Sequence, residues 1–130
     1  MKLKPSEQES LEVAAKLFKA IEQGNVAAVR NLYAPQIKIW HNFDGATQTI
    51  EENLALLEWM VGNIAEIAYT DIKRQPTPTG FVQQHVLHGT AKSSGKKVAV
   101  AGCMVGIVEG GQITRLDEYL DSAQIAAMRG

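Results

Sequence analysis

Residues 97–120 read KVAVAGCMVGIVEGGQITRLDEYL, and their pattern indicates the fold class. Apolar residues dominate 97–109, where Ala101, Cys103, Val105 and Ile107 follow a period of two, and in 112–120 the same period places Leu116 and Leu120 on one face, which is the pattern of β-strands. Gly110 and Gly111 separate the two runs by the length of a tight turn. The stretch therefore predicts two long antiparallel strands joined as a hairpin.

The rest of the chain adds more strands next to this hairpin and helices before them. The apolar period changes from helical to strand-like near Ala65. Helices followed by a run of strands are typical of an α+β fold, here with N-terminal helices packed on a curved, mostly antiparallel sheet. The predicted elements are the helices 6–23, 25–33 and 49–64, the strands 36–42, 67–75 and 81–91, and a last helical turn at 124–128.

Capping residues support two of the helix boundaries. Ser6 and Glu9 have the spacing of a capping box for the first helix, and Gly24 is expected to end it. Thr49 and Glu52 form the same pattern at the start of the third helix.

Composition excludes several classes of function. The 130 residues suit one domain, 1–130, and 45% of them are hydrophobic. Thirteen basic and 14 acidic residues give a net charge of −1, which predicts no nucleic-acid partner. No apolar segment approaches the length that spans a membrane, so the protein is not expected to have a membrane partner. A single cysteine and a polar N-terminal stretch predict a cytoplasmic protein.

Glu118 is the strongest candidate for a catalytic residue. Its strand places it on the same face as Leu116 and Leu120, which is expected to meet the core. A carboxylate among leucines is costly unless it is hydrogen-bonded or kept protonated. Its position therefore indicates a function in a pocket.

His41 lies at the end of the strand 36–42, on the face that it shares with Ile37 and Ile39. An imidazole there has a pKa suited to a general base. The alternative is a histidine hydrogen-bonded to the backbone at a strand end. Trp40 and Asn42 lie on the other face, so this pair and His41 are not expected to line one pocket unless a bulge intervenes.

The other histidines give no metal site. His85 and His88 are three residues apart on a strand and face opposite sides. With three histidines and one cysteine in the whole chain, no metal and no cofactor are predicted. His85 is favoured for the pocket, and His88 for the surface or an interface.

Four stretches together suggest a family. Residues 32–35, 37–42, 49–57 and above all 111–121 resemble the SnoaL-like branch of the nuclear-transport-factor-2-like superfamily, which also contains ketosteroid isomerase, limonene-epoxide hydrolase and scytalone dehydratase. The resemblance implies a cone-shaped α+β barrel with a deep apolar pocket. It also implies a homodimer formed through the sheet.

The epoxide hydrolase pattern is matched only in part. Trp40 and Asn42 fall where that family has a tyrosine and an asparagine that hold the nucleophilic water, and Glu118 falls on one of its carboxylates. The remaining acid and the arginine are matched by Leu87 and His85, and neither residue is of the required type. The resemblance therefore does not imply epoxide hydrolysis by that mechanism.

The ketosteroid isomerase pattern is also incomplete. His41 takes the place of the aspartate base, and Leu17 that of the tyrosine in the oxyanion hole. The prediction is a cofactor-independent acid–base enzyme of the isomerase, cyclase, dehydratase or hydrolase type, in which Glu118 and His41 or His85 exchange protons with a small apolar substrate. The residues expected to bind the substrate are Trp40, Asn42, Leu116 and Leu120.

A second hypothesis is a ligand-binding or accessory protein with the same pocket and no turnover. The feature that separates the two is whether two titratable groups converge within hydrogen-bond distance around an open cavity.

Overall fold

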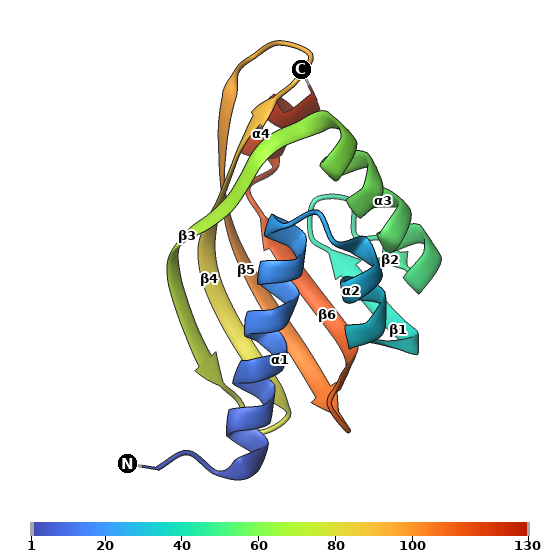
Figure 1. Ribbon diagram of the computed structural model, residues 1–130, viewed down its shortest axis with the longest axis vertical. Helices are drawn as coiled ribbons and strands as arrows, with labels where there is room; N and C mark the ends of the chain where they lie inside the picture. Colours follow the sequence, from blue (N-terminus) through green and yellow to red (C-terminus); the bar gives the residue numbers. More distant parts are fainter. Residues whose placement is uncertain (1, 130) are drawn as a thin grey trace.

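A computed structural model describes residues 2–129. Helices lead and a run of long strands follows, as the change of apolar period predicts (Figure 1). The elements in chain order are α1 (Pro5–Glu22), α2 (Val26–Leu32), β1 (Tyr33–His41), β2 (Thr47–Gln48), α3 (Ile50–Asn63), β3 (Ile64–Pro76), β4 (Gly80–Ala91), β5 (Lys97–Glu109), β6 (Gln112–Leu120), α4 (Ser122–Ala126) and a final 3₁₀ turn (Ala127–Arg129).

The six strands form one curved sheet in the order β2-β1-β6-β5-β4-β3. Strands β3 to β6 form an antiparallel meander, and β2 pairs antiparallel with β1. The β1–β6 pair is parallel and joins the first strand to the last. The sheet is therefore mostly antiparallel, and the α+β prediction is confirmed. Strands β2 and β3 remain the two edges of the sheet.

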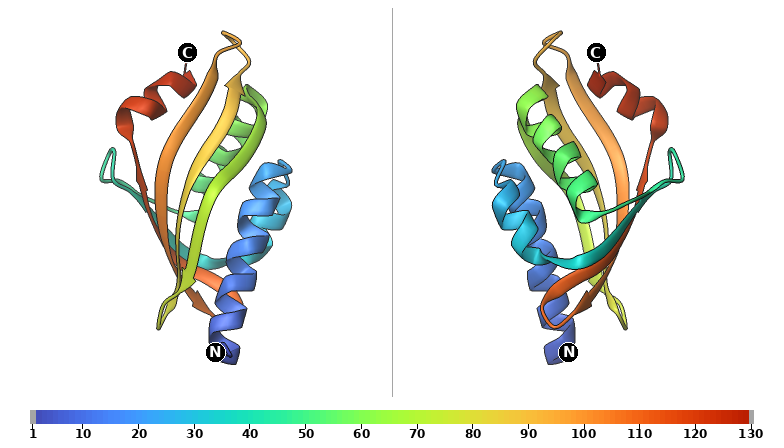
Figure 2. Two further views of the ribbon diagram at one scale, coloured as in Figure 1. Left: turned by 90° about the vertical axis from the view of Figure 1, so that its left-hand side faces the viewer. Right: turned by 90° about the vertical axis from the view of Figure 1, so that its right-hand side faces the viewer.

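Two helices cover one face of the sheet and close the core. In Figure 1, α1 packs on β3 and β4, and α3 lies beside β1. The side views in Figure 2 show the twisted sheet wrapping around these helices, with the chain termini at opposite ends of the molecule. The most completely buried large side chains come from both layers, and they include Leu17, Ile39, Phe81, Ile113 and Leu116.

The first helix begins earlier than the sequence predicts. Its first residue is Pro5, and the Glu7 carboxylate accepts a hydrogen bond from the Lys4 amide at 2.8 Å. Proline suits the first helical position because its φ is preset and it lacks the amide hydrogen that would be left unpaired. The predicted capping box of Ser6 and Glu9 is therefore wrong, and Glu9 instead accepts a hydrogen bond from the Gly111 amide at 3.1 Å.

The other predicted caps are confirmed. Thr49 and Glu52 form a reciprocal capping box at the start of α3. Gly24 ends the first helical segment with a φ of +68°, a conformation that side chains with a Cβ atom rarely adopt. Strand β1 begins at Tyr33 and not at Gln36, because α2 leads directly into it without a loop.

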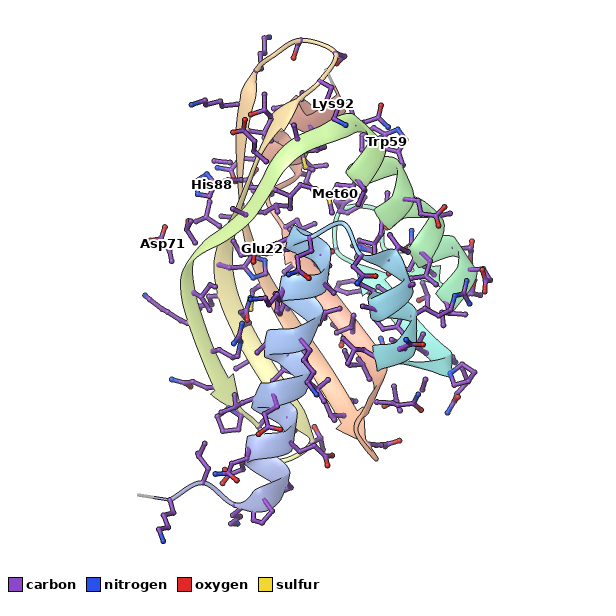
Figure 3. All side chains as sticks on the ribbon, viewed as in Figure 1. Glu22, Trp59, Met60, Asp71, His88 and Lys92 are labelled. Carbon is purple, nitrogen blue, oxygen red and sulfur yellow. The ribbon has the colours of Figure 1, made fainter. Side chains whose placement is uncertain are left out.

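Strand β3 contains two irregularities that the sequence does not signal. Glu66 and Asp71 have φ values of 57° and 53°, and the pairing with β4 shifts at both places. Such bulges bend a strand and change the direction of its side chains. Between them, the Tyr69 amide donates a hydrogen bond to Glu22 at the end of α1, at 2.8 Å. Figure 3 shows Glu22 on the inner side of the sheet, and Asp71 with His88 on the outer side.

Candidate functional site

The parallel pairing of β1 with β6 brings His41 and Glu118 together. The two residues are register partners at the ends of their strands. His41 Nε2 lies 2.9 Å from Glu118 Oε1, and the exposed fractions of the two side chains are 3% and 17%. The alternation along each strand turns both side chains inward, with Ile39 and Leu116 as the preceding inward pair.

This pair forms part of the wall of a mostly apolar cavity. The cavity of about 110 Å³ has room for a few water molecules or a compact ligand. Leu116 and Leu120, expected from the sequence to bind substrate, contribute to its wall beside Glu118. Helix α3 and the C-terminal residues close the other sides, with Leu56, Leu57, Trp59, Met60, Ile125, Met128 and Arg129. In Figure 3, Trp59 and Met60 lie on the last turns of α3, toward the end of the molecule that holds the C-terminus.

The Glu118 carboxylate acts on the pKa values of four other side chains in the cavity wall. Burial lowers the pKa of His41, but the hydrogen bond and the charge of Glu118 outweigh it, so the pKa of His41 is raised above its ordinary value. Burial and the same carboxylate raise the pKa of the hydroxyls of Tyr33 and Tyr69 well above the usual range, so both are neutral donors near pH 7.

His85 lies on another wall of the same cavity. It is 4% exposed, and its ring packs edge-on against Phe18 and Tyr69 with centroid distances of 5.2 and 4.7 Å. Its Nδ1 atom lies 2.9 Å from the amide nitrogen of Gln83. Burial lowers the pKa of His85, and the charge of Glu118 opposes this without reversing it. His85 is therefore neutral near pH 7, in contrast to His41, whose pKa is raised.

Trp40, on the opposite face of β1, and Asn42, which directly follows β1, lie outside the cavity. The Trp40 ring packs edge-on against Tyr119 at 5.3 Å. Asn42 forms two hydrogen bonds with the backbone of Leu120, at 2.8 and 3.3 Å, and so fixes the end of β6 next to Glu118. Neither residue is among those that line the cavity within residues 2–129.

Tyr33, Tyr69 and Asn53 also line the cavity and are not among the site residues predicted from the sequence. The Tyr33 hydroxyl donates to Asn53 Oδ1 at 2.8 Å, and Asn53 in turn donates to Gln48 at 3.0 Å. A buried asparagine on the apolar face of a predicted helix was an available signal, because such a side chain needs a polar partner. The inward direction of Tyr69 gave no such signal, since it depends on the bulges of β3.

Comparison with known proteins identifies the family. The model of the SnoaL-like domain family matches residues 14–116, which is more than half of the chain. The chain belongs to the SnoaL-like domain family. No curated protein matches it.

Solved structures show the fold of this SnoaL-like domain in proteins of differing description. One is a protein from Xanthomonas campestris pv. campestris, provisionally described as a polyketide cyclase, with a TM-score of 0.84, 18% identity and coverage of 96% of this chain and 99% of that one. Another is an LEH-like epoxide hydrolase from M. tuberculosis, with a TM-score of 0.77, 15% identity and coverage of 95% and 91%. At these identities the likeness establishes the fold alone.

A third structure is a protein with a ketosteroid isomerase-like fold from Catenulispora acidiphila DSM 44928, in complex with trimethylamine. It has a TM-score of 0.79, 20% identity and coverage of 90% of this chain and 91% of that one.

Two further features bear on the SnoaL-like domain as a whole. Within residues 2–129, no three histidine, cysteine, aspartate or glutamate side chains gather as metal ligands would. Among the helices in the described part of the chain, none has the length and apolar character needed to cross a lipid bilayer.

Proposed function

We propose that this SnoaL-like domain is a cofactor-independent acid–base enzyme of the isomerase or cyclase type, acting on a compact, mostly apolar carbonyl compound. The observation that carries the proposal is the Glu118–His41 pair, held at 2.9 Å in the wall of an apolar cavity. A titratable pair in such a cavity is a typical location for proton transfer.

Glu118 is the base in this proposal. Its Oε1 is held by His41, and Oε2 has no hydrogen-bond partner in residues 2–129, so Oε2 is the oxygen that meets the substrate. It takes a proton from a carbon next to the substrate carbonyl: the C–H bond breaks, an O–H bond forms on Glu118, and the electron pair moves onto the carbonyl oxygen as an enolate. In a substrate whose enolate is conjugated with a C=C bond, return of the proton from Glu118 to the far carbon completes an isomerisation. In a substrate with a second carbonyl group, attack of the enolate carbon forms a C–C bond and breaks the C=O π bond, and the resulting alkoxide takes the proton back from Glu118 as the ring closes.

The contact between His41 Nε2 and Glu118 Oε1 at 2.9 Å holds the carboxylate in position. Leu116 and Leu120 provide apolar contact to the substrate on either side of Glu118 along β6. Trp40 and Asn42 act from outside the cavity, where Asn42 holds the backbone at the end of β6.

The test measures proton abstraction directly. The exchange of the α-protons of 2-indanone, a compact ketone, is followed by NMR in D₂O with the wild-type protein, with Glu118→Gln and with Asp117→Asn as the matched control on the opposite face of β6. We expect catalysis by the wild type and by the control, and a loss on the order of a hundredfold or more for Glu118→Gln, because a general base typically contributes that much.

Equal exchange by wild type and Glu118→Gln, or no exchange above buffer with the wild type, overturns the proposal. Binding of 2-indanone without exchange favours the second hypothesis, a ligand-binding protein without turnover. That hypothesis is supported by the contact between His41 Nε2 and Glu118 Oε1 at 2.9 Å, because an oxygen that is already paired with His41 is not available to a substrate.

We also infer a homodimer formed through the outer face of the sheet. Large apolar side chains remain exposed on the strands, including Ile72 at 45% and Tyr119 at 46%. Exposed apolar residues on a sheet are often covered by a second copy of the chain. Sedimentation velocity is expected to give the mass of two chains, and a mass near that of one chain excludes the dimer.

A further inference from the structure

A buried side-chain relay leads from the surface to His85. Gln83, which has no exposed surface, lies between Arg74 and His85 on the inward face of β4. Arg74 Nε donates to Gln83 Oε1 at 2.6 Å, and Gln83 Nε2 lies 2.9 Å from His85 Nδ1. The guanidinium of Arg74 also lies 5.8 Å over the Phe18 ring, which holds it in place.

The relay determines which nitrogen of His85 carries the hydrogen. A guanidinium has donors and no acceptor, so the atom of Gln83 that faces Arg74 is the carbonyl oxygen. The NH₂ group of Gln83 then faces His85, and Nδ1 accepts its hydrogen bond with a lone pair. The hydrogen of neutral His85 is therefore on Nε2.

The Nε2–H group of His85 is free to donate into the cavity. His85 lines the cavity, and Nε2 has no hydrogen-bond partner in residues 2–129. Within the same residues, the one polar side-chain atom that is both sealed from solvent and unpaired is His41 Nδ1, so His85 Nε2 is not sealed. Gly102 on the neighbouring strand β5 has no Cβ atom, and this leaves room beside His85 Nε2. A Cβ atom added to Gly102 would lie only 3.1 Å from this nitrogen.

We propose that Gln83, held by Arg74, is a positioning residue that fixes His85 as a neutral Nε2–H donor, and that this donor binds an acceptor oxygen of the substrate. The tautomer follows from the hydrogen bonds alone, whereas the action on a substrate oxygen rests on the proposed function. His85 is then not a base: the enolate oxygen formed when Glu118 takes the proton is stabilised by the hydrogen bond from His85.

The charges around His85 are consistent with this donor. Two charged groups act on its ring: Arg74 disfavours the imidazolium and Glu118 favours it. Tyr69, which packs against the ring, is neutral. Protonation of Nδ1 would also place a hydrogen against the NH₂ group of Gln83. The relay therefore opposes a charged His85 as well as the other neutral tautomer.

The first experiment determines the tautomer by long-range ¹H–¹⁵N NMR of the histidine rings. In the wild type we expect a pyrrole-type signal for His85 Nε2 and a pyridine-type signal for Nδ1. In Gln83→Glu the carboxylate accepts from Nδ1–H, so the Nδ1 signal is expected to become pyrrole-type and the midpoint of His85 titration to rise. Gln84→Glu, which adds the same charge one residue along on the outer face of β4, is expected to leave His85 unchanged. A wild-type His85 with its hydrogen on Nδ1 overturns the proposal.

The second experiment tests the action on the substrate through the 2-indanone exchange. Loss of one donor to a developing oxyanion typically costs on the order of a hundredfold in kcat. We expect this for Gln83→Glu, with a smaller change in KM, at a pH above the midpoint of His85 titration in that variant, because an imidazolium would keep its Nε2–H. Gln83→Met, which removes the relay without adding charge, is expected to give a mixture of tautomers and an intermediate rate. Wild-type rates in Gln83→Glu, with Glu118→Gln inactive, overturn the donor role while the proposed function stands. Absence of exchange in the wild type overturns the proposed function and the donor role, and the NMR result alone then decides the tautomer.

Discussion

Replacing Glu118 by glutamine is expected to change stability in a way that depends on pH. The glutamine side chain would keep an oxygen that accepts the hydrogen bond from His41 Nε2, and the substitution would remove the negative charge. The variant is therefore expected to be less stable than the wild type at pH 5.5, where His41 is protonated. As the pH rises through the raised folded-state pKa of His41, this deficit is expected to disappear, and above that pKa the variant is expected to be equally stable or slightly more stable, because it holds no carboxylate in the apolar cavity.

The direction of this pH dependence follows from His41. Burial lowers the pKa of His41, but the hydrogen bond and charge of Glu118 raise it by more, so it lies above the ordinary 6.5 in the folded protein. A group with a raised pKa adds stability that is fully present below 6.5 and is lost as the pH rises through the folded-state pKa. A hydrogen bond between ionised groups contributes about 1 kcal/mol more than a neutral one, so the loss at pH 5.5 is about 1 kcal/mol.

Urea unfolding of the wild type, Glu118→Gln and Glu12→Gln at pH 5.5, 7 and 8.5 measures this effect. Glu12 is an exposed carboxylate on α1, and its variant is expected to follow the wild type at every pH. At the acidic end, a difference of this size corresponds to a Tm lower by roughly 4 °C. A stability difference between Glu118→Gln and wild type that is constant across the range would refute the coupling of His41 protonation to Glu118.

Two further substitutions test the packing of the cavity. In Gly102→Ala the added Cβ atom meets His85 Nε2 at 3.1 Å, and this crowding is expected to lower the free energy of unfolding by about 1–3 kcal/mol and to weaken the binding of 2-indanone in an NMR titration. Tyr33→Phe removes the buried donor to Asn53 Oδ1 and is expected to cost about 1–2 kcal/mol, measured by urea unfolding against Tyr119→Phe, whose ring is 46% exposed.

The parts of the site that were predictable are those that depend on strand periodicity. His41 shares the inward face of β1 with Ile37 and Ile39, and all three are buried as the alternation predicts. Glu118 follows Leu116 on the inward face of β6 for the same reason. A period of two is a local property of a strand, so the sequence reveals which side chains point the same way.

The parts that were not predictable depend on pairing between distant strands and on local distortions. Nothing in either segment indicates that β1 and β6 pair in parallel with His41 opposite Glu118, because register is set by the packing of the whole sheet. The bulges of β3 lie at Glu66 and Asp71, which are not glycines and so give no warning of a positive φ. Tyr69 lies between them, and its place in the cavity was therefore not visible in the sequence.

The arrangement of charges explains why an apolar cavity suits the proposed chemistry. Before the reaction the negative charge in the cavity wall is on Glu118, and the substrate is neutral. Transfer of a proton to Glu118 neutralises that carboxylate and leaves the negative charge on the substrate oxygen, so the charge moves and none is created. An apolar wall would penalise a newly formed charge far more than one that changes place. The neutral Nε2–H of His85 then donates to the charge where it arrives, without the repulsion from Arg74 that a charged His85 would experience.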